Sequence, residues 1–241
     1  MNGEAISRSA ALLGADAIKR LAAAKVLVVG VGGVGSWCAE ALVRTGIGHL
    51  TLMDDDVVVA SNLNRQCPAT VAALGRPKVE AMRDRLLAID PSADVVARAE
   101  RFTGVEDIGG FDVVVDAIDS VACKAALVLK AMDGGTPVVS SMGAALRVDP
   151  TKVRVTRFAK VEGDGLARAL RRRFRADGRV PPAFDCVWSA EAPRDCAERG
   201  SLMQVTATFG MCLASRVIDL CLGCENDAAL PAADVRSVPR R

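Results

Sequence analysis

The chain has 241 residues, of which 51% are hydrophobic and 25% charged, and its formal net charge is +2. This length and apolar content are enough to bury the core of one large α/β domain, so we predict a single domain over residues 1–241. A net charge so close to zero excludes a globally basic nucleic-acid binder, although arginines concentrate locally between residues 168 and 179.

Eight cysteines are scattered along the chain, and no secretory signal pattern precedes them. This usage predicts reduced thiols in a cytoplasmic protein without disulfides. The longest apolar stretch, residues 202–215, contains Gln204 and is followed by Arg216. It is shorter than the roughly 20 residues that a membrane span needs. We therefore predict a buried helix there and no association with membranes.

The first half of the chain alternates between short apolar runs and segments with helical spacing. In chain order, these predict a helix over residues 15–24, a strand over 26–29, a helix over 34–45, a strand over 49–53, a helix from 77 to the Asp-Pro pair at 90–91, a strand around 95–96, a strand over 112–117, a helix over 123–132 and a strand over 137–139. Alternating strands and helices predict a Rossmann-like, doubly wound, mostly parallel sheet.

From residue 143 the pattern changes. It predicts a polar strand around residues 153–155, an arginine-rich helix, a loop over 181–200 and a long apolar helix over about 201–222. Within the single domain we expect a nucleotide-binding core over 1–142, a C-terminal cap for the substrate over 143–224 and a flexible tail over 225–241.

A glycine-rich loop joins the first predicted core strand to the next helix. Its glycines are Gly30, Gly32, Gly33 and Gly35. In such loops glycine allows a tight turn, close approach of the backbone to phosphate and close packing of helix on strand. Asp54 follows about 19 residues later at the end of the next strand, where a carboxylate can hold ribose hydroxyls. The pattern predicts a nucleotide site, which by itself fits NAD as well as ATP.

Polar side chains further along the chain favour phosphate chemistry over hydride transfer. Arg65 offers a planar fork for phosphate oxygens, Lys78 a point charge at a helix start and Asn62 a neutral donor. Asp119 follows a predicted strand and is a hard oxygen ligand suited to Mg²⁺. Asp56 adds another carboxylate close to Asp54. A nicotinamide enzyme needs no such set.

Four stretches together resemble the E1-like (ThiF/MoeB-type) family of adenylating enzymes. They are Gly-Val-Gly-Gly-Val-Gly-Ser at 30–36, Ser-Asn-Leu-Asn-Arg-Gln at 61–66, the lysine at 78 and Asp-Ala-Ile-Asp-Ser at 116–120. The resemblance runs from about residue 8 to residue 222. It implies an ATP-using enzyme that activates a carboxylate as an acyl-adenylate.

The resemblance also implies roles for single residues. Asp54 would hold the ribose and Asp119 would place magnesium. The triphosphate would be held by Asn62, Arg65 and Lys78. Arg8 resembles the arginine that family members insert into the partner subunit's ATP site, which implies a homodimer; the alternative is an ordinary exposed arginine near the chain terminus.

Within the family, residues 141–150, 153–156, 159–160, 185–191 and 205–210 resemble the tRNA threonylcarbamoyladenosine dehydratase branch. That branch would adenylate the carboxylate of N6-threonylcarbamoyladenosine in tRNA and promote its cyclisation. One alternative is an adenylyltransferase that activates the C-terminus of a sulfur-carrier or ubiquitin-like protein, with a cysteine desulfurase or sulfur-acceptor system as partner. A more distant alternative is an NAD-binding dehydrogenase or regulatory module.

The cysteines bear on this choice. Sulfur-carrier activators commonly have two Cys-x-x-Cys pairs, whereas this chain has one, Cys221 and Cys224. One pair supplies two ligands where zinc takes four, which favours the tRNA branch. Cys186 and Cys196 are candidate nucleophiles, since some E1-like enzymes use cysteine, but nothing in the sequence indicates a lowered pKa for either thiol.

The arginine-rich helix predicts contact with RNA. At about 100° per residue, Leu166, Leu170 and Phe174 fall on one face of the helix. The opposite face carries Arg168, Arg171, Arg172, Arg175 and Arg179. Such a stripe can neutralise RNA phosphates without reading sequence. The alternative is a solvated helix face, because arginine is also a good helix former.

Overall fold

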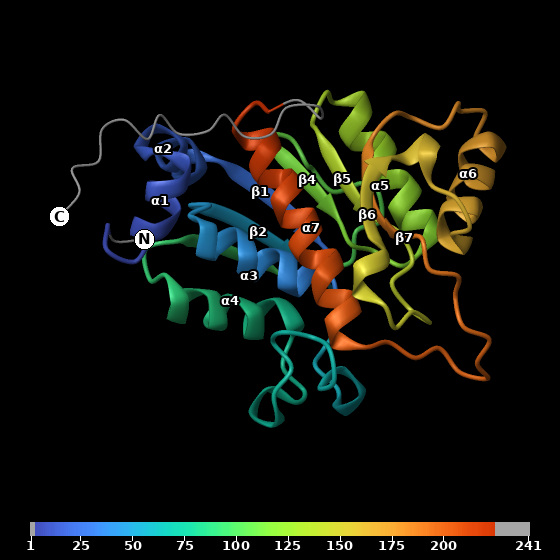
Figure 1. Ribbon diagram of the computed structural model, residues 1–241, viewed down its shortest axis with the longest axis horizontal. Coiled ribbons are helices and arrows are strands. Elements are labelled where there is room, and N and C mark those ends of the chain that lie inside the picture. Colours follow the sequence, from blue (N-terminus) through green and yellow to red (C-terminus); the bar gives the residue numbers. More distant parts are fainter. Residues whose placement is uncertain (1–2, 225–241) are drawn as a thin grey trace.

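The computed structural model describes residues 3–224 (Figure 1). Its helices and strands, in chain order, are α1 (Ser7–Leu13), α2 (Ala15–Ala23), β1 (Lys25–Val29), α3 (Gly35–Thr45), β2 (His49–Met53), α4 (Lys78–Ile89), β3 (Asp94–Arg98), β4 (Val113–Asp116), α5 (Val121–Asp133), β5 (Val138–Ser141), β6 (Val153–Arg157), α6 (Gly165–Ala176), β7 (Asp185–Ser189) and α7 (Met203–Cys221). Short 3-10 helices are η1 (Ala60–Asn62), η2 (Val71–Ala73), η3 (Pro150–Lys152) and η4 (Phe158–Lys160). The predicted tail over 225–241 lies outside the described residues.

The strands form a seven-stranded sheet in the order β3-β2-β1-β4-β5-β7-β6. All neighbouring strands run parallel except β6, which is antiparallel to β7. This confirms the predicted doubly wound, mostly parallel sheet. The order reverses between β1 and β4, so the loops after these two strands open a crevice at the carboxyl edge of the sheet. Open α/β sheets bind their ligands at such a point.

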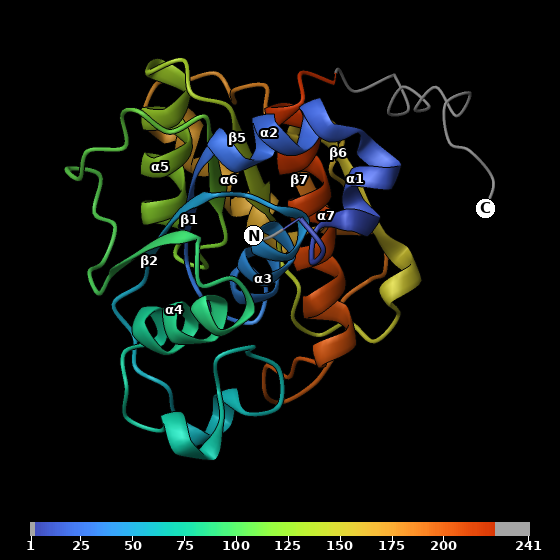
Figure 2. The same cartoon turned by 90° about the vertical axis from the view of Figure 1, so that its left-hand side faces the viewer.

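Helices cover both faces of the sheet because its central strands are apolar on both sides. Along β1, Val26 and Val28 pack into the core beneath α3, α4 and α7, while Leu27 and Val29 pack into the core beneath α5 and α6. The alternation follows from the two-residue period of a strand. In Figure 2, α5 and α7 lie on opposite sides of the sheet. Burial on both faces explains the continuous apolar run that predicted this strand.

The second half of the chain differs from the prediction. The prediction of a loop over residues 181–200 is wrong, because these residues contain β7. The strand is short and begins with Asp185, whose buried carboxylate is paired with Arg216 of α7 at 2.6 Å. Because its first residue is a polar aspartate, the sequence pattern did not indicate this strand. Because β6 and β7 extend the same sheet, the strands of residues 143–224 are continuous with those of residues 1–142. No helix within residues 3–224 is both long and apolar enough to cross a membrane.

Candidate nucleotide and substrate site

The glycine loop has the close approaches that require glycine. Gly30 has a φ of +92°, and a Cβ atom there would lie 2.7 Å from the carbonyl oxygen of Ala117, in the loop after β4. A Cβ atom on Gly35 would lie 1.9 Å from the carbonyl oxygen of Gly30. The two loops at the reversal point are therefore in contact. The N-terminus of α3 begins at this loop, where its free amides favour an anion.

Asp54 anchors the glycine loop to β2. Its carboxylate accepts hydrogen bonds from the backbone nitrogens of Val31 at 2.6 Å and of Asp56 at 2.9 Å. Burial raises the pKa of Asp54. A carboxylate has about four acceptor positions, so both oxygens retain capacity for ribose hydroxyls. The geometry is compatible with the role that the resemblance implied.

The segment that carries Arg65 is held against the first turn of α3. The indole nitrogen of Trp37 donates to the carbonyl oxygen of Arg65 at 2.9 Å, and the backbone nitrogen of Cys67 donates to Ser36 Oγ at 3.1 Å. Asn62 is buried, and its Oδ1 accepts from the backbone nitrogen of Val59 at 3.2 Å. Asn62 therefore shapes the turn that presents Arg65.

Arg65 itself lies beside the glycine loop, 3.3 Å from the Cβ position of Gly33. Its guanidinium donates to the carbonyl oxygen of Ser61 at 2.8 Å and to Asn64 Oδ1 at 2.9 Å. Both partners are neutral, and Arg65 forms no ion pair with any residue in the described part of the chain. Its positive charge is thus available to a phosphate at the loop.

Sequence reasoning assigned no role to Gln66, which follows Arg65. Its side chain is buried, and Oε1 has no hydrogen-bond partner among residues 3–224. Its amide nitrogen lies 3.9 Å from the Cβ position of Gly32. A buried polar atom without a partner is costly in a folded protein. An orphaned polar atom beside the glycine loop fits a site built for a ligand.

Lys78 and Asp56 form an ion pair at the start of α4, with Nζ and Oδ2 2.6 Å apart. The lysine side chain is only 6% exposed, whereas the aspartate side chain is 66% exposed. The backbone nitrogen of Lys78 also donates to the carbonyl oxygen of Asp56 at 3.0 Å. The buried lysine is therefore aimed at the open side, where a phosphate can replace or join the carboxylate.

Asp119 is exposed in the loop between β4 and α5 and forms no ion pair within the described residues. Below it lies a buried network that sequence reasoning missed. Lys124 of α5 donates to Asp116 Oδ2 at 2.7 Å, to Ser140 Oγ at 3.2 Å and to the carbonyl oxygen of Ser141 at 2.9 Å. The only signal was a lysine on an otherwise apolar helix face. The network ties β4, α5 and β5 together beneath the loop.

The α1 helix places Arg8 away from its own nucleotide loop. Its neighbour Ile6 packs against Gly46, which ends α3, with Ile6 Cδ1 3.2 Å from the glycine's Cβ position. The glycine loop is at the other end of α3, about 16 Å away for an 11-residue helix. Arg8 is exposed. It does not meet the other site residues within one copy of the chain.

The two candidate nucleophiles differ in their surroundings. Cys186 is buried in β7, and burial raises the pKa of its thiol to about 12. Such a thiol is protonated at neutral pH, which argues against a role as nucleophile. Cys196 is exposed in the loop between β7 and α7.

Among the described residues, the acidic run from Asp54 to Asp56 is the one group of possible ligands close enough together to hold a metal ion. Cys221 and Cys224 therefore have no further ligands beside them within these residues.

The arginines of α6 are less uniform than the pattern predicted. Arg171 donates to the carbonyl oxygens of Phe158 at 2.9 Å and Val161 at 2.7 Å, and its guanidinium lies over the Phe158 ring. It therefore packs η4 onto α6. Arg179 lies beyond the end of α6 and pairs with Asp133. The three that remain exposed, with no ion pair inside the described region, are Arg168, Arg172 and Arg175.

Another buried ion pair, between Arg147 and Asp164, connects the start of α6 to the carboxyl end of β5. Asp164 caps α6 by accepting from the backbone nitrogen of Ala167 at 2.8 Å. Its other oxygen accepts from Arg147 Nη2 at 3.1 Å and from the backbone nitrogen of Gly143 at 3.2 Å. Sequence reasoning did not foresee this pair. It brings the first turn of α6 to the edge of the sheet where the glycine loop lies.

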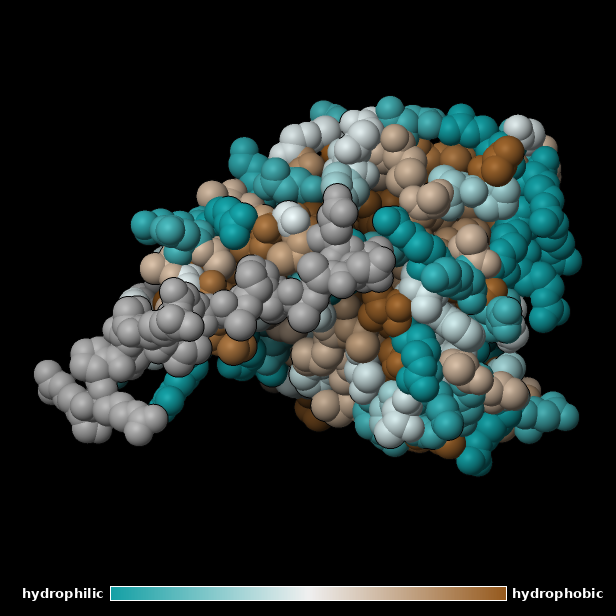
Figure 3. Space-filling view, turned by 45° about the horizontal axis from the view of Figure 1, so that its top comes forward, coloured by the Kyte–Doolittle hydropathy of each residue, from teal (hydrophilic) through white to brown (hydrophobic). Residues whose placement is uncertain are grey.

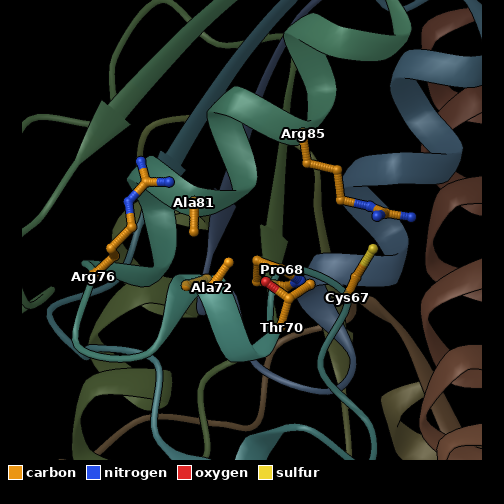
Figure 4. Close-up of a pocket in the computed structure, with 8 residues that line it drawn as sticks. Cys67, Pro68, Thr70, Ala72, Arg76, Ala81 and Arg85 are labelled. Atoms are coloured by element: carbon orange, nitrogen blue, oxygen red, sulfur yellow. The ribbon is translucent and has the colours of Figure 1, made fainter.

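A small cavity of about 180 Å³ lies between α4 and the loop before it, and Cys67, Thr70, Arg76 and Arg85 are among its lining residues (Figure 4). The charged side chains that line this cavity already have partners of opposite charge within the protein. Arg85 and the Cys67 thiol both bond to the buried carboxylate of Glu40, and Arg76 pairs with Asp84. The cavity holds none of the predicted site residues, so we assign it no ligand.

The fold and the site define a nucleotide-binding protein of the ThiF family, whose family model matches residues 6–236. The chain belongs to that family. It is 38% identical to the tRNA threonylcarbamoyladenosine dehydratase of Escherichia coli, over 87% of this chain and 90% of that protein. It is 35% identical to the Bacillus subtilis protein of the same name, over 78% of this chain and 75% of that protein.

Comparison with solved structures points to the same group of proteins. The crystal structure of the Escherichia coli tRNA N6-threonylcarbamoyladenosine dehydratase in complex with ATP is similar to this chain with a TM-score of 0.88 and 38% identity, and the match covers 92% of this chain and 95% of that one. A molybdopterin-synthase adenylyltransferase from Salmonella typhimurium is also related, at 32% identity over 91% of this chain and 80% of that protein.

Proposed function

We propose that this protein is an ATP-dependent dehydratase that adenylates the carboxylate of N6-threonylcarbamoyladenosine in tRNA and promotes its cyclisation. The observation that carries the adenylation step is the meeting of three elements at the reversal point: the glycine loop, Arg65 beside Gly33, and the Asp119 loop beside Gly30. The substrate is supported by the dehydratase relatives, whose similarity spans both the nucleotide-binding core and residues 143–224.

The reaction divides into two steps. First, the threonyl carboxylate attacks the α-phosphate of ATP, and the bond to pyrophosphate breaks to leave an acyl-adenylate. Then a nucleophile within the same threonylcarbamoyl group attacks the activated carbonyl, closes a ring and releases AMP, so the nucleoside loses water overall. Arg65 and Lys78 serve this chemistry by holding the phosphates and neutralising their charge.

Asp119 is the residue that we propose to hold Mg²⁺. Its carboxylate is exposed at the carboxyl edge of the sheet beside the glycine loop, and a hard oxygen donor next to a phosphate site suits this ion. When bound, the ion supplies further neutralisation of phosphate charge. The chain contributes a rigid loop, because the buried pair of Lys124 and Asp116 fixes the backbone just before Asp119.

A homodimer would complete the nucleotide site. Arg8 lies at the far end of α3 from the glycine loop of its own chain, so it can reach an ATP only in another copy. It is exposed and without an ion pair among residues 3–224, as an arginine donated to a partner would be. Arg8→Ala is therefore expected to impair adenylation without affecting folding, and mixing it with an Arg65→Ala chain should restore some activity.

The exposed arginines of α6 are proposed to hold tRNA. Arg168, Arg172 and Arg175 are spaced by four and three residues, which aligns them on one face of the helix. They neutralise phosphates without reading sequence. Their helix starts at the carboxyl edge of the sheet through the contact of Asp164 with Gly143. A bound tRNA would thus extend from the nucleotide site along α6. We place this reaction in the cytoplasm.

A second candidate function is activation of a sulfur-carrier or ubiquitin-like protein. The relatedness to a molybdopterin-synthase adenylyltransferase favours it, and the exposed Cys196 is a thiol that a sulfur-transfer partner could reach. Both functions share the adenylation step. They differ in the substrate, so a substrate test decides between them.

The deciding experiment incubates the full-length protein with ATP, MgCl₂ and tRNA that carries N6-threonylcarbamoyladenosine. We expect AMP and pyrophosphate to form only when this tRNA is present, and nucleoside mass spectrometry to show a loss of 18 Da, the mass of one water. Matched tRNA without the modification is the control. If the nucleoside mass stays unchanged and the protein instead catalyses pyrophosphate exchange with a carrier protein, the second candidate function is correct and the tRNA assignment is wrong. Absence of exchange with any carboxylate would refute adenylation.

A further inference from the structure

Trp188 is the one residue of β7 that is not fully buried. Its side chain lies on the sheet face covered by α5 and α6, since Cys186, two residues earlier, packs in the core of that face. The indole nitrogen donates to Thr156 Oγ1 on β6 at 2.9 Å. This bond fixes the ring, so the indole is a rigid aromatic surface of which part is open to solvent.

A cationic side chain lies next to this ring. Arg154 is directly opposite Trp188 in the antiparallel pair of β6 and β7, so both side chains project from the same face as neighbours. Arg154 is exposed and donates to the carbonyl oxygens of Thr151 at 2.7 Å and Val153 at 2.9 Å. It forms no ion pair with a carboxylate of the described chain. Its charge is therefore free to meet an anion.

The position of β7 in the sheet relates this pair to the nucleotide site. β7 runs parallel to β5, so Trp188, near the carboxyl end of β7, lies at the same edge as the glycine loop. In strand order β7 is three positions from β1, about 14 Å at ~4.8 Å per strand. The indole is too far from the glycine loop to touch the reacting phosphate. It is close enough to hold a neighbouring part of the same substrate.

The α6 helix adds cationic side chains on the same side of the molecule. Figure 1 shows β6, β7 and α6 together at one end of the sheet, and Figure 3 shows hydrophilic side chains gathered along that side. The contact of Asp164 with Gly143 at 3.2 Å brings the first turn of α6, with Arg168, to the carboxyl edge. An aromatic ring with a neighbouring arginine, and further arginines on the same side of the molecule, is a combination of side chains that binds single-stranded nucleic acid.

We propose that Trp188 is a stacking platform for a nucleobase of the tRNA that flanks the modified adenosine, with Arg154 and Arg168 on the adjoining phosphates. Proteins recognise unpaired RNA bases by stacking them on aromatic rings, and arginine binds the backbone beside them. The proposal rests on the proposed function, because it takes tRNA as the substrate. It assigns to this end of the sheet the task of orienting the tRNA so that the modified base enters the nucleotide site.

The chain has only two tryptophans, Trp37 and Trp188, which makes the proposal directly measurable. In the full-length Trp188→Phe variant, Trp37 is the sole indole fluorophore and its hydrogen bond to Arg65 is kept, so the difference between wild-type and Trp188→Phe emission reports on Trp188. We expect the Trp188 fluorescence to fall saturably on titration with tRNA carrying N6-threonylcarbamoyladenosine, with the midpoint given by filter binding. If Trp188 fluorescence stays constant when the protein is saturated with tRNA that it converts, the stacking proposal is wrong and the proposed function is unaffected. If wild-type protein binds no tRNA, the proposed function fails and the stacking proposal with it.

Binding measurements on variants give a second, independent test. Trp188→Ala is expected to weaken tRNA binding about tenfold or more, with the KM for ATP unchanged, while Trp188→Phe keeps a ring and most of the affinity. Thr156→Val removes only the hydrogen bond to the indole and should leave tRNA affinity nearly unchanged, which separates stacking from local packing. Thermal denaturation checks the fold of each variant. Wild-type tRNA affinity in a folded Trp188→Ala protein contradicts the proposal.

Discussion

Lys124 Nζ lies 2.7 Å from Asp116 Oδ2, and both side chains are completely buried beneath the loop that carries Asp119. The aspartate also accepts from Ser140 Oγ at 2.6 Å and from the backbone nitrogen of Ile118 at 3.1 Å. One carboxylate thus joins a strand, a helix and the loop of the candidate site. Asp116, the last residue of β4, is therefore held by charge and hydrogen bonds inside the core, which anchors the start of the loop.

Removing one partner of this pair should destabilise the protein. Lys124→Met leaves the Asp116 carboxylate buried and unpaired, and we expect the free energy of unfolding to fall by about 3–5 kcal/mol. Urea denaturation followed by circular dichroism measures the change. The double variant Lys124→Met with Asp116→Asn removes the unpaired charge and should recover part of the loss. A single variant as stable as wild type would mean that the pair does not hold the loop.

Asp119→Ala should separate chemistry from folding. The side chain is exposed and has no ion pair within residues 3–224, so the free energy of unfolding should change by less than about 0.5 kcal/mol. AMP release should be nearly abolished at every Mg²⁺ concentration, because the proposed metal ligand is gone. Asp16→Ala on α2, which removes another exposed carboxylate, is the control and should keep full activity. An active Asp119→Ala enzyme would reassign the magnesium ligand.

Glu40 makes a pH-dependent contribution to stability. Burial raises the pKa of its carboxyl group, but hydrogen bonds from Arg85, Cys67 and Arg44 outweigh burial and lower it to about 2. Since the folded pKa lies below the ordinary value near 4.3, the ionised group stabilises the protein above that value. The contribution is lost as the pH falls toward 2.

Glu40→Gln should therefore lower the free energy of unfolding by up to about 3 kcal/mol at pH 7. The difference from wild type should shrink steadily between about pH 5 and pH 3, because the Glu40 carboxyl group takes up a proton there in the unfolded state while it stays ionised in the folded state. Urea denaturation at a series of pH values measures both curves. Asp84→Asn, which breaks the exposed pair with Arg76, is the control and should have a small effect. A difference that stays constant with pH would contradict the low pKa.

Charge reversal on α6 should affect tRNA and spare ATP. Replacing Arg172 and Arg175 by glutamate introduces repulsion of phosphates, so tRNA affinity should fall by at least tenfold at low salt, and the difference should narrow as salt rises. The KM for ATP should stay the same. Lys19→Glu with Arg83→Glu gives the same change in net charge on α2 and α4 and is the control. Equal losses of tRNA affinity in the two double variants would mean that the α6 arginines are a solvated surface with no role in tRNA binding.

Local sequence patterns were sufficient for most of the fold. The strand at 49–53 was predicted with the bounds that the structure has, and the strand at 26–29 and the helix at 34–45 each differ from their elements by one residue. Strand and helix periods are properties of a short segment, so they can be read from it directly. The glycine loop followed in the same way, because a turn between strand and helix imposes its own residue types. β7 was missed because its buried Asp185 is stable only beside Arg216.

The sequence by itself therefore determined where the chain turns, which runs enter the sheet and which side chains can meet a phosphate. The tertiary structure decided which of those side chains are free to do so. Arg171 is occupied by two carbonyl oxygens and a ring, and Arg179 by Asp133, whereas Arg168, Arg172 and Arg175 are exposed and have no ion pair within residues 3–224. The physical reason is that the partners of a charge come from other elements of the fold, and no local period encodes them.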